Sequence, residues 1–177
     1  MADTVANGDG RSNFPWRILG WGGAACLLLL PLVARAPWTL SDFIVAGAML
    51  GAAGVALELA VRASASLAYR AGASFAVLAA FLLVWVNGAV GFLGDEDNPA
   101  NLIFAGVLAI ALLGAVLAKF RAPGMASTMF ATAASQLLVG VAAQIAHWGS
   151  LYEIALGTTI FTALWLISAF LFRKAAA

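Results

Sequence analysis

The chain has 177 residues and a formal net charge of +1 at neutral pH. Hydrophobic residues make up 64% of it and charged residues 10%, whereas soluble domains usually carry about 45–50% apolar and about 25% charged residues. This composition excludes an ordinary water-soluble domain and predicts the lipid bilayer as a partner. The near-neutral charge gives no support for nucleic-acid binding.

The N-terminal tail, residues 1–13, is rich in Gly, Asn and Asp, which predicts a mobile tail on the cytoplasmic side. The first apolar stretch, 18–34, follows two arginines and ends near the sequence A-R-A, so it resembles a signal peptide with its cleavage site. Pro37 directly after that site argues against cleavage, and we interpret the stretch as a retained helix. Cys26 within it is the only cysteine, so no internal disulfide can form.

Five further apolar stretches follow, and each is long enough to cross a bilayer as a helix, which takes about 17–25 residues. With the first, the predicted spans are 18–34, 43–61, 71–93, 102–118, 125–146 and 154–172. Barrel strands would alternate between apolar and polar residues, but these runs are apolar at both odd and even positions. The predicted fold class is therefore all-α: one polytopic transmembrane domain, 14–177, built as a six-helix bundle.

The basic residues predict the orientation of the spans. Eight of the nine lie in alternate connections: Arg11, Arg17, Arg62, Arg70, Lys119, Arg121, Arg173 and Lys174. Basic residues in short loops stay on the cytoplasmic side, so both termini are expected there. The acidic residues of the opposite side are Asp42, Asp95, Glu96, Asp97 and Glu153.

Two similar segments suggest an internal hairpin repeat. Residues 42–47 (DFIVAG) lead after fifteen residues to Arg62, and residues 101–106 (NLIFAG) lead after fifteen residues to Arg121. Apolar helices drawn from few residue types also match by accident, so duplication and accident both stay open. Repeats of this kind are found in transporters, among other membrane proteins.

The most polar connection, 94–101, has two interpretations. Its candidate cation ligands are Asp95, Glu96, Asp97, Asn98 and Asn101. Carboxylate and amide oxygens are hard ligands suited to Ca²⁺ or Mg²⁺. The favoured alternative is structural: Asn98 as N-cap and Pro99 at the first helical position would start the next span. Neighbouring acidic groups would complement its helix dipole, and we assign no metal site.

Local patterns also account for other acidic residues. Ser150 and Glu153 have the spacing of a capping box, and Thr39 and Asp42 form a close relative of one. Glu58 lies within an apolar span, where ionisable residues are functional suspects. Arg62 follows at i+4, so an ion pair near the inner interface is favoured over a proton-carrying role.

Polar residues of the fifth predicted span fall on one side of the helix at 100° per residue. They are Thr128, Thr132, Gln136, Gly140, Gln144 and His147. We expect this side to point inward, where it would either bond to neighbouring helices, the commoner use, or line a polar vestibule open to the outside. The candidate vestibule residues are Asn87, Thr132, Gln136, Gln144 and His147.

Residues 85–91 (WVNGAVG), 95–102 (DEDNPANL) and 121–126 (RAPGMA) resemble a family of small multi-spanning inner-membrane proteins of Gram-negative bacteria. The likeness covers most of the chain. It implies a helix bundle in the bacterial inner membrane and adds no chemistry, because no activity is established for that family.

Three classes of function remain. A non-enzymatic scaffold or accessory bundle, which accompanies another membrane protein or self-associates, is favoured because small residues such as Gly47 and Gly51 let helices pack closely. A small permease or channel with an outward-facing polar vestibule is the first alternative. A divalent-cation binding protein of the periplasmic face is the second alternative. An enzyme needs an activated nucleophile or a paired acid and base, which Cys26, His147 and Glu58 lack in sequence, so we predict no enzyme and no cofactor.

Overall fold

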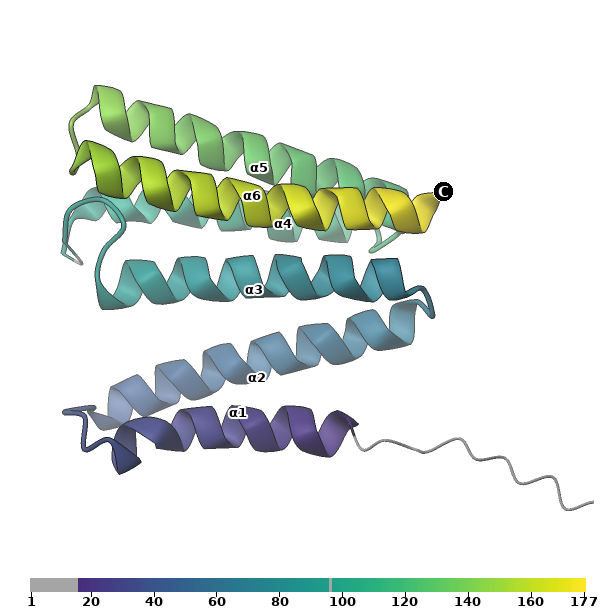
Figure 1. Cartoon of the computed structure of the whole chain (residues 1–177), viewed down its shortest axis with the longest axis horizontal. Coiled ribbons are helices and arrows are strands. Elements are labelled where there is room, and N and C mark those ends of the chain that lie inside the picture. Colours follow the sequence, from purple (N-terminus) through teal and green to yellow (C-terminus); the bar gives the residue numbers. More distant parts are fainter. Residues whose placement is uncertain (1–15, 96) are drawn as a thin grey trace, which may run out of the picture. The chain divides into compact units, whose positions relative to one another are not determined.

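The computed structural model describes residues 16–95 and 97–177, and all regular secondary structure in these residues is helical (Figure 1). The helices are α1 (Trp16–Val33), α2 (Leu40–Ala63), α3 (Leu67–Ala89), α4 (Ile103–Leu117), α5 (Ala122–Ile145) and α6 (Leu151–Ala176), and a short 3-10 helix, η1 (Pro99–Leu102), directly precedes α4. The predicted all-α class is confirmed for this part of the chain. The tail 1–13 and Glu96 lie outside the described residues.

Five helical segments are long and apolar enough to cross a membrane: α2, α3, η1 with α4, α5 and α6. Large apolar side chains cover their outer surfaces, as the 65% exposed Leu112 and the 69% exposed Leu138 illustrate. Such surfaces suit lipid and not water. α1 is also apolar but shorter, and it contains Pro31, so its role as a sixth span stays a prediction.

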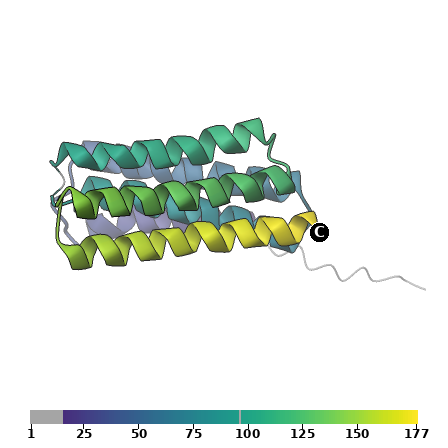
Figure 2. The same cartoon turned by 90° about the horizontal axis from the view of Figure 1, so that it is seen from above.

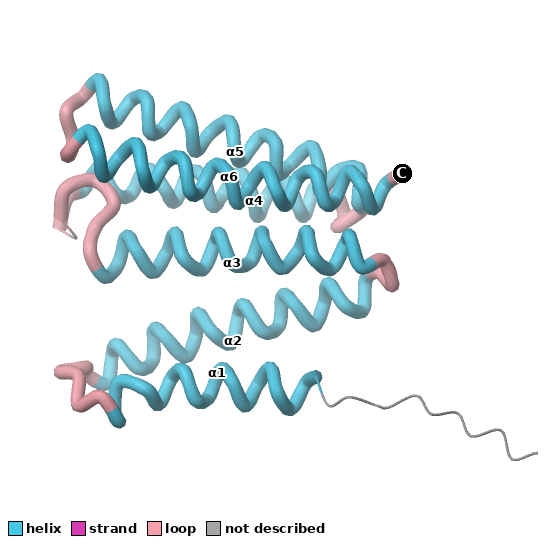
Figure 3. The backbone as a smooth tube through the Cα atoms, viewed as in Figure 1, coloured by secondary structure: helices cyan, strands magenta, loops and turns pink. Residues whose placement is uncertain are grey.

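The chain forms two compact units, residues 1–50 and residues 51–177. In the described part of the first unit, α1 and the beginning of α2 form a helical hairpin (Figure 3). Gly47 lies beside Leu28, because a Cβ at Gly47 would be 3.6 Å from the Leu28 Cδ2. Trp38 of the connection packs edge to face on Phe43 of α2, with ring centroids 5.3 Å apart.

In the second unit, α5 packs against both α4 and α6, and α3 packs along α6 (Figure 2). Small residues permit this close packing. A Cβ added at Gly114 of α4 or at Gly140 of α5 would come within 2.5 Å of the methyl carbon of Thr128 or of Thr158, respectively. The helix backbones therefore approach each other closely, which is the usual way in which membrane helices gain contact.

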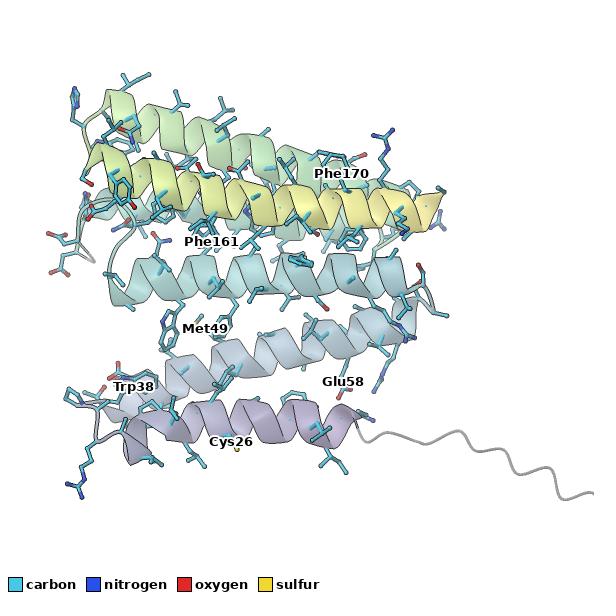
Figure 4. The ribbon with its side chains drawn as sticks, viewed as in Figure 1. Cys26, Trp38, Met49, Glu58, Phe161 and Phe170 are labelled. Atoms are coloured by element: carbon cyan, nitrogen blue, oxygen red, sulfur yellow. The ribbon has the colours of Figure 1, made fainter. Side chains whose placement is uncertain are left out.

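Aromatic side chains fill the interior of this second unit. Trp165 and Phe172 of α6 are fully buried, and Phe104 of α4 is 1% exposed. The labelled Phe161 projects from α6 into the interior (Figure 4), where its ring centroid lies 5.6 Å from that of Phe92. One further direct link joins the helices: the buried Ser168 hydroxyl donates to the Gly72 carbonyl at 2.7 Å.

The predicted third span, 71–93, is shifted in the structure. α3 begins at Leu67, where Ser66 caps it by accepting a hydrogen bond from the Tyr69 N–H, and it ends at Ala89. Phe92 and Leu93 are buried but not helical. The chain turns back through Gly91 (φ 76°) and Gly94 (φ 83°), conformations that glycine adopts readily. The predicted end of the span at residue 93 is wrong, because the apolar residues of this loop cannot be distinguished by hydropathy from a continuing helix.

The two ends of the second unit differ in charge. At one end the Tyr69 hydroxyl donates to the Phe120 carbonyl, and the Tyr69 ring packs edge to face on Phe172, so the start of α3, the α4–α5 connection and the end of α6 meet there. The basic residues of this end are Arg62, Arg70, Lys119, Arg121, Arg173 and Lys174. At the other end Gly149 lies beside Gly94, and its acidic residues include Asp95, Asp97 and Glu153.

Candidate functional site

The acidic α3–α4 loop, residues 90–98, is fastened by Asn101. The Asn101 Oδ1 accepts hydrogen bonds from the backbone N–H groups of Phe92 at 3.0 Å and Leu93 at 2.8 Å. Its Nδ2 donates to the Asp95 carbonyl at 2.7 Å. One side chain that is 8% exposed therefore pairs three backbone groups of the loop.

Asn98 completes the fastening. Its Oδ1 accepts from the Ala100 N–H at 3.0 Å, and its Nδ2 donates to the Leu93 carbonyl at 2.7 Å. The predicted N-cap with Pro99 behind it is confirmed, although the first turn is the 3-10 helix η1. Such short starts are frequent at helix N-termini.

These bonds bear on the candidate cation site. Both amide oxygens proposed as ligands already accept backbone N–H groups, while Asp95 and Asp97 are exposed. Glu96 lies outside the described residues. Elsewhere in residues 16–95 and 97–177, no three His, Cys, Asp or Glu side chains are grouped so that they could hold a metal ion.

The other predicted local contacts are present. Asp42 accepts from both the backbone N–H and the hydroxyl of Thr39, at 2.7 and 2.8 Å. The Ser150 hydroxyl accepts from the Glu153 N–H at 3.2 Å. Glu58, labelled on α2 in Figure 4, pairs with Arg62 at 3.3 Å. Helix ends and the intramembrane acid thus have the structural partners that the sequence predicts.

The polar side of α5 points inward along only part of its length. Thr132 and Gln136 have no exposed surface, and Thr128 is 8% exposed. The Thr132 hydroxyl donates to the Thr128 carbonyl of its own helix at 2.9 Å. Gln136 is different, because neither its Oε1 nor its Nε2 has a hydrogen-bond partner in the protein.

The remaining candidate vestibule residues do not join Gln136. The Asn87 Nδ2 donates to the Leu83 carbonyl of its own helix. The Gln144 Nε2 donates to the Leu151 carbonyl at 2.9 Å, which ties the end of α5 to the start of α6. His147 follows α5 with φ 54° and is exposed. Within the described residues, Asn87 forms no hydrogen bond with the polar side of α5, and its Oδ1 is buried without a partner in the protein.

Sequence reasoning missed the polar side of α6. Thr158, Thr162 and Trp165 follow one another at i, i+4 and i+7, which places them on one helix side. The Oγ1 atoms of both threonines and the Nε1 of Trp165 are buried without a hydrogen-bond partner in the protein. The same angular count that selected the α5 residues would have found this side, but isolated threonines in an apolar helix give a weak signal.

A shallow, open groove of about 380 Å³ lies between α4 and α5. Its lining residues are Ile110, Gly114, Leu117, Ala118, Gly124, Ser127, Thr128 and Ala131. Nearly all of them are apolar or small, so this groove offers little chemistry for catalysis.

Fold and site together define a multi-pass helical membrane protein. No protein-family model, curated protein or solved structure matches this chain. The resemblance to a family of small inner-membrane proteins therefore stays a prediction.

Proposed function

We propose that this chain is a six-span protein of a bacterial inner membrane and that it acts as a non-enzymatic scaffold or accessory bundle for another membrane protein or for a second copy of itself. The observation that carries this proposal is that the two asparagines of the acidic end bond to the protein's own backbone. The side-chain amides of Asn98 and Asn101 form hydrogen bonds with the backbone at the α3–α4 loop. These bonds fix the loop at the acidic end of the second unit. A bundle that closes itself in this way suits a supporting role.

The proposed orientation rests on the separation of charge within residues 51–177. Six basic residues gather at one end of the second unit, and basic residues near span ends are retained in the cytoplasm. With six spans, both termini then lie on the cytoplasmic side and the acidic loop faces the periplasm. Single cysteines at Asp97 and at Arg121, placed in a Cys26→Ala chain, test this with a membrane-impermeant thiol reagent in intact cells. Labelling at 97 and not at 121 is expected, and the reverse would contradict the orientation.

A non-enzymatic role is supported by the chemistry available. Nucleophilic or acid–base catalysis requires a reactive group held by an activating partner. Cys26 lies on α1, His147 follows α5, and Glu58 is paired with Arg62. None of them forms such a pair with another in the described structure.

A small permease or channel is the second candidate, because Gln136 places two unpartnered polar atoms inside the second unit. Reconstitution separates the two functions. Liposomes containing the purified chain are expected to release entrapped potassium, ammonium and small sugars no faster than empty liposomes. Release above that level would contradict the scaffold proposal and support a permease.

In-cell photo-crosslinking tests the scaffold directly. A photoreactive residue is placed in turn at the exposed positions Leu113 of α4, Leu138 of α5 and Ile160 of α6. A scaffold should yield a discrete protein adduct from at least one of these faces, with the buried position Ala143 as a negative control. Adducts with lipid alone from all three faces would contradict a stable protein partner.

A further inference from the structure

Four polar side chains form a buried polar seam inside the second unit: Gln136 of α5 and Thr158, Thr162 and Trp165 of α6. Gln136 and Trp165 have no exposed surface, and Thr158 is 6% exposed. Within the described part of the chain, five of their nitrogen and oxygen atoms have no hydrogen-bond partner in the protein: Gln136 Nε2, Gln136 Oε1, Thr158 Oγ1, Thr162 Oγ1 and Trp165 Nε1. Buried polar atoms in folded proteins are nearly always paired, so this cluster needs an explanation.

The register of the helices brings these side chains to one level. α5 and α6 are joined by a short connection and run antiparallel, and Gly140 lies directly against Thr158. One turn further along both helices, Gln136 lies at the level of Thr162. Trp165 follows three residues later on the same side of α6. At 1.5 Å per residue the seam is about 10 Å long.

The chemistry of the seam selects its ligand. Gln136 offers two donor hydrogens and an acceptor, each threonine offers one donor and an acceptor, and the indole offers one donor. The buried polar residues of the described structure include no charged side chain, so an ion there would have no counter-charge and would be very costly to desolvate. The close approach at Gly140, where an added Cβ would overlap Thr158, excludes a bulky ligand at that level of the seam.

We propose that the polar seam binds water: one molecule or a short file of molecules that bridges Gln136 to the hydroxyl and indole groups of α6. A buried water typically makes about three hydrogen bonds to groups that would otherwise be unpaired, and the seam supplies five such atoms. Water bridges would join α5 to α6 where direct bonds are lacking. This inference does not depend on the scaffold role, because an enclosed water site fits a static bundle as well as a permease.

Side-chain NMR on the full chain in detergent tests the proposal, because the sequence contains only two glutamines, Gln136 and Gln144. ¹⁵N-glutamine labelling gives two side-chain amide signals, and a Gln144→Glu variant assigns them. We expect a direct magnetisation-transfer peak between the Gln136 amide protons and water, measured in deuterated detergent. Gln144, which donates to a carbonyl near the surface, is the reference. A Gln136 amide without any water peak would overturn the proposal.

A matched pair of variants gives an independent test. Thr162→Val removes a seam hydroxyl, whereas Thr159→Val removes an exposed hydroxyl on the same helix that donates to the Ala155 carbonyl of its own helix. If water bridges the seam, Thr162→Val removes a hydrogen-bond partner of that water. The apparent Tm of Thr162→Val should then be at least about 3 °C below that of Thr159→Val. An equal or higher Tm for Thr162→Val would overturn the proposal, since removing an unpaired buried hydroxyl is neutral or stabilising.

Discussion

At the acidic end, replacement of Asn101 should lower the free energy of unfolding more than replacement of any other side chain. In Asn101→Leu the side chain is still branched at Cγ, but the N–H groups of Phe92 and Leu93 lose their acceptor and the Asp95 carbonyl loses its donor. Leu93 is fully buried and Phe92 is 7% exposed, so their N–H groups are shielded from bulk water.

The magnitude follows from these two N–H groups. A buried group left unpaired costs about 1–3 kcal/mol. Partial access of water near the exposed Gly94 and Asp95 favours the lower part of the summed range, about 2–4 kcal/mol. For a chain of this size that corresponds to a fall in apparent Tm of about 4–16 °C.

Thermal unfolding in detergent, followed by tryptophan fluorescence, measures this loss. Asn101→Asp keeps the acceptor for both N–H groups and should lose clearly less, and the exposed Asp97→Asn is the control for a change of charge in the loop. Hydrogen exchange at Phe92 and Leu93 should accelerate at least about tenfold in Asn101→Leu. A Tm within about 1 °C of the parent chain, with unchanged exchange at both amides, would refute the assigned role of Asn101.

Three further predictions concern the cap, the helix contacts and the cation hypothesis. Asn98→Ala should lower the free energy of unfolding by about 0.5–2 kcal/mol through loss of the N-cap, measured by the same thermal assay, and no loss would argue against the cap. Gly140→Ala should lower the free energy of unfolding by about 1–3 kcal/mol because the new Cβ overlaps Thr158. Adding Thr158→Ala to the same chain should recover part of this loss. If the losses of the two single variants simply added in the double variant, the contact between the two residues would be contradicted. Millimolar Ca²⁺ should shift Tm by less than about 1 °C, because the amide oxygens of the acidic loop are already engaged, whereas clear stabilisation would restore the cation site.

Much of the fold could be predicted from the sequence because its signals are local. Apolar stretches set the number of helices, and short-range cap chemistry at Asn98 and Ser150 marked where helices begin. The end of α3 was not predictable in this way. Phe92 and Leu93 are as apolar as the helix before them, and only the path of the loop through Gly91 and Gly94 shows that they are buried outside it.

The candidate site was predicted less completely, because it depends on contacts between distant segments. The inward side of α5 follows from angular position, and Gln136 is indeed fully buried. Its counterpart on α6 depends on the register set by Gly140 and Thr158, which no local pattern contains. The three bonds of Asn101 likewise require the loop to fold back by six to nine residues.

The last helix, α6, supplies contacts to α3 and to the α3–α4 loop. Phe161 supports Phe92, Ser168 bonds to Gly72, and Phe172 packs on Tyr69. During biosynthesis α6 leaves the ribosome after the segments that it contacts, so α3 and the α3–α4 loop lack these contacts until α6 has been made. Chains that terminate before Leu151 lack them altogether and should be substrates for membrane quality-control proteases.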